Sequence, residues 1–152
     1  SGGKNPRLYW LFQSLMVKAF IDTNIVIRFL VQDAPHKAAA CAKLFEMIEA
    51  GEIRAYTSSF VIAEFLFVLI KQYKYPKIKV IDAAISFLNL RNMTLIESGD
   101  TSLALKLYHQ YSIKYGDCLI ATQVPEKATL VTYDQDFGKI PGLKFQKPEA
   151  IL

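Results

Sequence analysis

Several features on which common protein classes depend are scarce in this sequence. The longest apolar runs, such as residues 65–70, are far shorter than the roughly 20 residues that a helix needs to cross a bilayer. The chain has only two histidines and two cysteines and no Cys-x-x-Cys pair, so a zinc site has almost no imidazole or thiolate ligands available. We therefore expect neither membrane contact nor a zinc centre.

The two cysteines, Cys41 and Cys118, lie within helical patterns rather than in paired loops. Such positions favour packed free thiols over a disulfide. Free thiols are typical of a reducing compartment, so we expect the protein to be cytoplasmic.

The first fifteen residues differ in composition from the rest. Met16 begins a strand-like run, and we interpret residues 1–15 as a tag or vector-derived extension and residues 16–152 as one domain. A signal peptide fits less well, because no small-residue cleavage pattern follows the apolar stretch. Without Lys4 and Arg7 the formal net charge falls from +4 to +2, so the pI near 9.0 is modest support for a polyanionic partner.

From Met16 onward, short strand-like runs alternate with longer helical patterns. This alternation is typical of an α/β fold, here a three-layer α/β/α sandwich with a mainly parallel central sheet. The expected strands span residues 17–21, 54–57, 93–96, 129–132 and, at an edge, 143–146. The expected helices span residues 23–30, 35–50, 58–71, 77–90, 101–109 and 115–123.

Glu64 interrupts residues 60–70, a helix that is apolar on nearly every side. A lone buried carboxylate is costly unless it is paired or binds a metal ion. A capping role fits poorly, because the third position of this helix is Val61 or Ile62. A solvent-facing edge of the helix is the alternative, but we favour a functional carboxylate.

The other acids each have an ordinary structural explanation when taken alone. Asp22 follows the first strand and can cap the next helix, and Asp117 lies in a first helical turn, where the helix dipole favours a negative charge. Asp134 and Asp136 lie in a turn, where aspartates commonly bond to their own backbone.

In combination these acids indicate a metal site. Asp22, Glu64, Asp117 and Asp134 lie where a strand enters a helix or within the first turns of one, and such ends converge in an open parallel sheet. Two carboxylates about 4 Å apart repel by roughly 4 kcal/mol at an effective dielectric of about 20, so the cluster needs cations. Oxygen ligands alone favour Mg²⁺ or Mn²⁺.

Residues 16–152 resemble the PIN-domain proteins, in particular the VapC-like toxin ribonucleases of toxin–antitoxin pairs. Four segments carry the resemblance, each weak alone but all in the right order and spacing. They are residues 20–24 (FIDTN), 59–64 (SFVIAE), 116–121 (GDCLIA) and 130–137 (LVTYDQDF).

The resemblance implies the roles of individual residues. The catalytic and metal-binding acids are then Asp22, Glu64, Asp117 and, as the less regular fourth, Asp134. Asp136 is the substitute for that fourth acid. The site would hold one or two Mg²⁺ or Mn²⁺ ions and hydrolyse RNA to a 5′-phosphate and a 3′-hydroxyl, with a carboxylate or metal-bound hydroxide as the base.

Two further positions match polar residues that orient ligands or water in such sites. They are Asn24 and Thr132. The departure from the family pattern is Cys118, which stands where a small alanine is common and should alter packing more than chemistry.

The resemblance also implies partners. Members of the family often form homodimers and bind a small antitoxin that lays a helix in a groove and reaches into the acidic site. The apolar excess of residues 60–70 favours a second buried surface such as a dimer contact, although an ordinary core helix explains the same residues.

A basic and aromatic segment follows the Glu64 helix. Lysines interleaved with tyrosines can hold and stack single-stranded RNA, whereas a solvated helix end explains the same pattern equally well. The RNA rim that this segment would form comprises Lys71, Tyr73, Lys74, Tyr75 and Lys77.

Other functions remain as alternatives. A haloacid-dehalogenase-type phosphatase needs a second aspartate where this chain has Asn24, and a receiver domain needs a lysine after a late strand, whereas Lys127 precedes it. A catalytically inactive nucleic-acid or antitoxin-binding module and a DNA-acting nuclease of the same fold stay open.

Overall fold

The computed structural model describes residues 5–152, except for the side chains of residues 12–14. Its centre is a sheet of five parallel strands in the order β3-β2-β1-β4-β5. The expected α/β class is confirmed, and every strand of this sheet is parallel. The strands are β1 (Val17–Ile21), β2 (Ile53–Ser58), β3 (Met93–Ile96), β4 (Thr129–Val131) and β5 (Phe145–Gln146).

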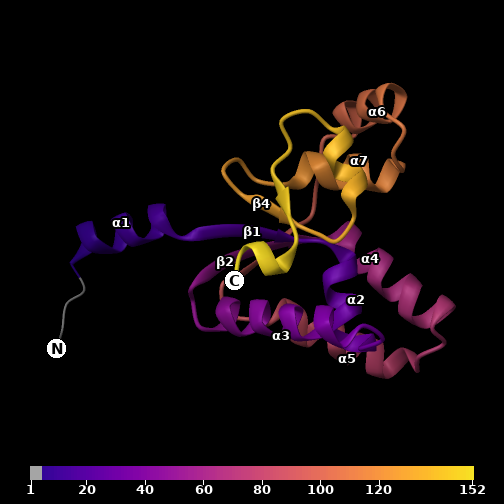
Figure 1. Ribbon diagram of the computed structural model, residues 1–152, viewed down its shortest axis with the longest axis horizontal. Coiled ribbons are helices and arrows are strands. Elements are labelled where there is room, and N and C mark those ends of the chain that lie inside the picture. Colours follow the sequence, from indigo (N-terminus) through magenta and orange to yellow (C-terminus); the bar gives the residue numbers. More distant parts are fainter. Residues whose placement is uncertain (1–4) are drawn as a thin grey trace.

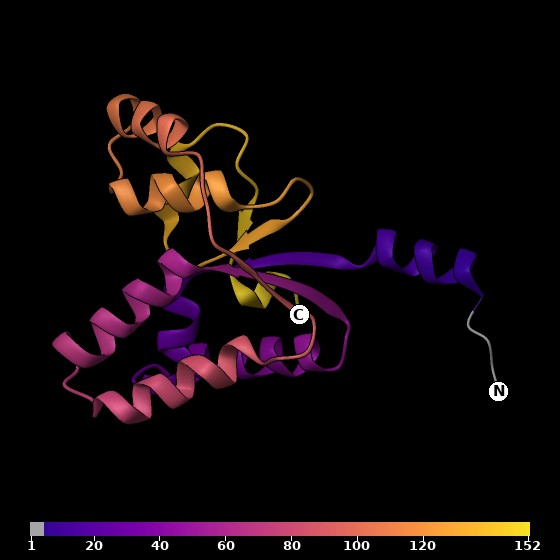
Figure 2. The ribbon, with the colours of Figure 1, turned by 180° about the vertical axis from the view of Figure 1, so that it is seen from behind.

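Helices cover both faces of this sheet, which confirms the three-layer sandwich (Figure 1). Figure 2 shows the same layers from behind, with α6 and α7 on one side of the sheet and α2, α3 and α5 on the other. The helices of the sandwich are α2 (Thr23–Val31), α3 (Pro35–Glu49), α4 (Ser59–Phe67), α5 (Lys77–Leu88), α6 (Thr101–Gln110) and α7 (Tyr115–Gln123).

Neighbouring residues of the central strands point into two separate cores. In β1, Ala19 and Ile21 belong to the core beneath α2, α3 and α5, whereas Phe20 belongs to the core beneath α6 and α7. Val131 and Leu130 of β4 divide in the same way, and all five side chains are fully buried. Burial on both faces explains why these strands are apolar at nearly every position.

Helix α4 begins at the edge of the sheet and bridges the two cores. Of the two adjacent serines that could cap it, the structure uses Ser58, whose hydroxyl oxygen accepts a 3.2 Å hydrogen bond from the Val61 N–H. Val61 then packs into the α6–α7 core and Phe65 into the opposite one. The chain continues as a π-helical turn, Val68–Gln72, so the expected single helix is divided in two.

The N-terminal segment includes a helix of its own. Helix α1 (Pro6–Leu15) lies away from the sandwich (Figure 1), and Trp10 is 73% exposed. Residues 1–4 of the expected extension lie outside the described residues. The division of the chain at Met16 stays a prediction.

The state of the two thiols agrees with expectation. Cys41 and Cys118 are both free and buried. Across residues 5–152, no helix is long and apolar enough to cross a membrane.

The cap of α4 can be tested by substitution. Ser58→Ala removes the buried acceptor of the Val61 N–H and should lower the free energy of unfolding by about 1 kcal/mol, measured by urea denaturation. Ser59→Ala, at the exposed neighbouring position, is the matched control and should change it much less. Equal losses in the two variants would contradict this assignment of the cap.

Candidate active site

The sequence-predicted acids gather at one edge of the sheet. Strands β2, β1 and β4 are neighbours and parallel, so their carboxyl ends lie together. Asp22 follows β1, Thr132 follows β4, and α4 with Glu64 follows β2. This edge is where open parallel sheets bind their ligands.

Asp22 is the most firmly held of the acids. It is 4% exposed and accepts hydrogen bonds from the Thr23 N–H (2.7 Å), Asn24 Nδ2 (3.0 Å) and the Thr132 hydroxyl (2.7 Å). Burial raises the pKa of Asp22, while the bond from Thr132 opposes that rise. The expected N-cap and the expected acid of the site are therefore the same side chain.

Asn24 and Thr132 join Asp22 to the loop after β4. Asn24 Nδ2 lies 3.0 Å from the Thr132 hydroxyl oxygen, and Asn24 Oδ1 accepts a 3.1 Å bond from the Tyr133 N–H. Thr132 Oγ1 in turn accepts a 3.0 Å bond from the Asp134 N–H. The two residues expected to orient the site thus contact Asp22 and position the backbone of Asp134.

Glu64 is half-buried, whereas its apolar neighbours in the sequence had predicted that it would be fully buried. The reason is that α4 bridges two cores at the sheet edge and leaves part of its surface open. Its Oε1 accepts a 3.2 Å hydrogen bond from the Thr23 hydroxyl. Burial and the charge of Asp22 raise the pKa of Glu64, and the bond from Thr23 and the charge of Lys114 lower it.

Asp117 lies in the first turn of α7, 8% exposed, and its Oδ2 has no hydrogen-bond partner. Its pKa rises from 3.8 to about 7, mainly because of burial. Next in effect come the negative charges of Asp22 and Asp134, followed by that of Glu64, with Lys114 opposing them. The structure therefore brings all four predicted acids close enough to act on one another.

Gly116 allows α7 to approach α4. A Cβ at this position would lie 2.7 Å from Phe60 Cζ and 3.9 Å from Glu64 Oε2. Any larger residue would push against the ring of Phe60 on α4, so the missing side chain lets Asp117 come near Glu64. The sequence placed Gly116 in a motif without showing this packing role.

Asp134 and Asp136 differ in their partners. Asp134 caps the short 3-10 helix Gln135–Lys139 by accepting a 2.9 Å bond from the Asp136 N–H, and its charge raises the pKa of Asp22. Asp136 instead pairs with Lys139 at 3.2 Å. This geometry favours Asp134 as the fourth acid.

The donor atoms of the cluster suit a hard divalent cation. They are carboxylate oxygens alone, and Asp117 Oδ2 is buried without a partner. As the side chains stand, however, no three His, Cys, Asp or Glu side chains among the described residues are close enough together to form a ready-made metal site. The four carboxylates repel one another, so their side chains would have to draw together around a cation to bind it.

Three residues that touch or influence the acids were given no role by the sequence analysis. They are Thr23, Gly116 and Lys114. Lys114 lies one helical turn before Asp117, and that spacing is the only signal the sequence offers for it.

The expected RNA rim lies elsewhere. Its residues are all exposed, and they run from the π-helical turn after α4 to the first residue of α5, at the end of α4 that points away from the sheet (Figure 1). They are Lys71, Tyr73, Lys74, Tyr75 and Lys77. The rings of Tyr73 and Tyr75 pair at 6.0 Å.

A family model decides the classification of this chain. The model of the PIN domain matches residues 19–143. The chain belongs to the PIN-domain family. None of the curated proteins resembles it closely enough to count as a match.

Solved structures share the fold of this PIN domain. VapBC2 from Rickettsia felis, bound to a DNA fragment from its promoter, matches with a TM-score of 0.65 and 21% identity over 86% of this chain and 98% of that chain. A toxin–antitoxin complex from Klebsiella pneumoniae matches with a TM-score of 0.56 and 25% identity, covering 86% and 97%. The sarcin–ricin-loop-cleaving toxin VapC20 from Mycobacterium tuberculosis matches with a TM-score of 0.57 and 16% identity, covering 79% and 92%.

The raised pKa of Asp117 makes stability depend on pH. Between 3.8 and about 7 the folded protein binds more protons than the unfolded chain, so the free energy of unfolding should fall as pH rises through this range and level off above it. Asp117→Asn should reduce that fall in metal-free urea denaturation. Asp82→Asn, an exposed acid on α5, should leave it unchanged, and equal pH profiles of wild type and Asp117→Asn would contradict the raised pKa.

Proposed function

We propose that this PIN domain is a metal-dependent ribonuclease and the toxin of a toxin–antitoxin pair, acting in the cytoplasm. The observation that carries the proposal is the grouping of four acids at one sheet edge, where the charges of Asp22, Glu64 and Asp134 raise the pKa of Asp117. Four acids from four separate chain segments repel one another and destabilise the protein unless a bound cation balances their negative charge. The sarcin–ricin-loop-cleaving neighbour supports RNA as the substrate.

These four acids would hold Mg²⁺ or Mn²⁺, one or two ions per site. A divalent cation there supplies the positive charge that activates a water molecule and offsets the charge on the leaving oxygen. Asp22 is kept in place by its three hydrogen bonds, and Thr23 orients Glu64. Asn24 and Thr132 hold the backbone of the loop that carries Asp134.

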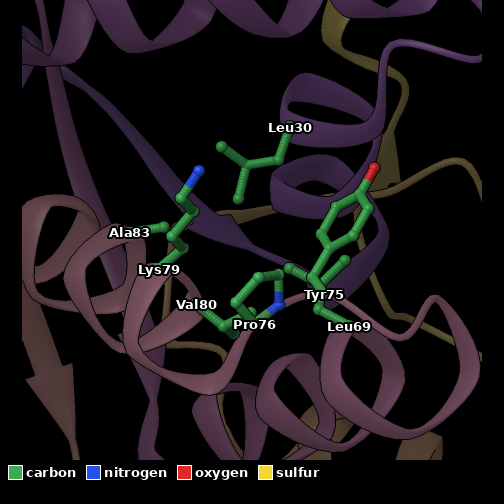
Figure 3. A pocket seen from close by; sticks show the side chains of 7 residues that line it. All are labelled: Leu30, Leu69, Tyr75, Pro76, Lys79, Val80 and Ala83. Carbon is green, nitrogen blue, oxygen red and sulfur yellow. The ribbon is translucent and has the colours of Figure 1, made fainter.

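An antitoxin has a groove available in this structure. A hollow of about 350 Å³ between α2, α3 and α5 is apolar, with Phe29, Phe45 and Phe87 among its lining. A second hollow of about 330 Å³ shares Leu30 and Ala83 with it and extends the groove. Figure 3 shows that Leu30 and Ala83, with the side chains around them, surround this second hollow.

We assign this groove to an apolar helix of the antitoxin. Toxin–antitoxin complexes are among the solved structures with this fold, which supports that occupant over a small ligand. The groove is lined by the helix α2 that Asp22 caps, so a bound segment could continue toward the acidic site.

Nuclease activity can be measured directly. The antitoxin-free protein should cleave a labelled structured RNA with Mg²⁺ or Mn²⁺ and stop when a chelator is added. Amide variants of the four acids should lower the rate by roughly 100-fold or more, because each removes a metal-binding charge. They are Asp22→Asn, Glu64→Gln, Asp117→Asn and Asp134→Asn.

The controls separate the alternatives. Asp82→Asn should cleave like the wild type, and Asp134→Asn should lose more activity than Asp136→Asn if Asp134 is the fourth acid. Cleavage of DNA but not RNA would point to a DNA-acting nuclease of this fold. Binding of RNA without cleavage by folded, metal-loaded protein would contradict the enzyme and favour a binding module.

A homodimer is the second assembly we propose. Exposed apolar side chains support it: Phe67 on α4 is 59% exposed, and Ile78, Ile81 and Ile85 form one exposed stripe along α5.

The dimer is tested by size-exclusion chromatography with light scattering. The wild type should have the mass of a dimer, and Ile85→Glu should shift it to a monomer because the charge would be buried in the contact. Leu105→Glu, at a similarly exposed apolar position on α6, is the control and should stay dimeric. A monomeric wild type would overturn the proposal.

A further inference from the structure

A hollow with basic and aromatic lining opens beside the acidic site. It has a volume of about 540 Å³ and is lined by residues 108–114, which are the end of α6 and its connection to α7, together with Asp136. Asp117 follows this connection by three residues, and Asp134 precedes Asp136 by two. Two chain segments therefore lead from the lining of the hollow to predicted acids of the site.

Lys114 brings a positive charge to the lining of this hollow. It is exposed, and its charge lowers the pKa of both Glu64 and Asp117. Yet none of the ion pairs found within the described part of the chain includes it. Its charge reaches the acids, and no ion pair among the described residues keeps its ammonium group from meeting an anion.

Lys139, in contrast, contacts two residues in the lining of the same hollow. Its Nζ donates a 3.0 Å hydrogen bond to the Ser112 carbonyl and pairs with Asp136. These contacts tie the α6–α7 connection to the short 3-10 helix after β4. The wall of the hollow is thereby held in place, which leaves Lys114 as its free charge.

Tyr108 supplies an aromatic surface to the lining of the hollow. It is 53% exposed, and its ring meets that of Tyr115 edge to face, with centroids 5.8 Å apart. Tyr115 belongs to α7, the helix that carries Asp117. The exposed ring is therefore supported by the same element that positions a predicted catalytic acid.

A free cation beside an exposed aromatic ring is the combination that binds single-stranded nucleic acid, through a phosphate and a stacked base. We propose that this hollow binds the nucleotide next to the cleaved bond, with Lys114 on a phosphate and Tyr108 against a base; the proposal rests on the ribonuclease function. A cation is needed here because the acids alone would repel the substrate backbone. None of the lysines of the expected rim is among the charges that act on Glu64 or Asp117.

The test uses the full chain with Asp117→Asn added to prevent cleavage. Binding of a labelled single-stranded oligoribonucleotide is followed by fluorescence anisotropy in Mg²⁺ buffer at several salt concentrations. Lys114→Ala should reduce the slope of log Kobs against log salt by about 0.7, because one phosphate contact is lost. Tyr108→Ala should weaken binding by roughly tenfold at an unchanged slope, because stacking does not release counterions.

Conservative variants and a matched lysine act as controls. Lys114→Arg and Tyr108→Phe should retain binding, since they keep the charge and the ring. Lys106→Ala removes an exposed lysine from the same helix as Tyr108 but from nearly the opposite side, and should leave the salt slope unchanged.

Three outcomes would overturn the proposal. In the first, the protein with Asp117 intact cleaves RNA, but Lys114→Ala and Tyr108→Ala leave binding unchanged; the ribonuclease function then stands and this inference fails. Loss of binding in Lys77→Ala or Tyr73→Ala, with the hollow variants unaffected, places the RNA on the α4–α5 connection instead. If the Asp117-intact protein neither binds nor cleaves RNA, the proposed function fails and this inference fails with it.

Discussion

The hydroxyl of Thr132 connects the two strand ends on which the site depends. It donates to Asp22 at the end of β1 and accepts from the Asp134 N–H after β4. A carboxylate as buried as Asp22 would be costly without such bonds. Because one hydroxyl serves both segments, the position of Asp134 follows from that of Asp22, and the spacing of the acids is set by neighbouring strands.

This arrangement keeps like charges together against their repulsion. The pKa of Asp117, raised to about 7, reflects both its burial and the three other acids. The repulsion does not drive the acids apart because their backbone positions are set by the two apolar cores on either side of the sheet. A site of this kind stores unfavourable electrostatic energy that a divalent cation can relieve. Because such a cation also binds phosphate oxygens, this is the physical reason to connect the site with phosphodiester chemistry.

Most of the fold could be predicted from local patterns. Strands 17–21 and 93–96 and helix 115–123 have the expected bounds, because short apolar runs and helical spacing are properties of the chain itself. The helix expected over 58–71 is instead divided by a π-helical turn, which no local pattern announced. The burial of Glu64 was overestimated for a related reason: apolar neighbours in the sequence do not say which face of a helix the rest of the fold leaves open.

The sequence by itself determined the alternation of strands and helices, the parallel sheet, and the four acids at the ends of its elements. Those features depend on residue type and spacing, which are present in any chain of this sequence. Only the tertiary structure decided which groups meet: Thr23 with Glu64, Gly116 with Phe60, and Lys139 with Ser112. These contacts join segments 27 to 56 residues apart. The tertiary structure also lets the charge of Lys114 act on Glu64, 50 residues earlier in the chain. Contacts between segments so far apart in the sequence form only when the sheet brings its strand ends together, and no local stretch of the chain predicts that packing.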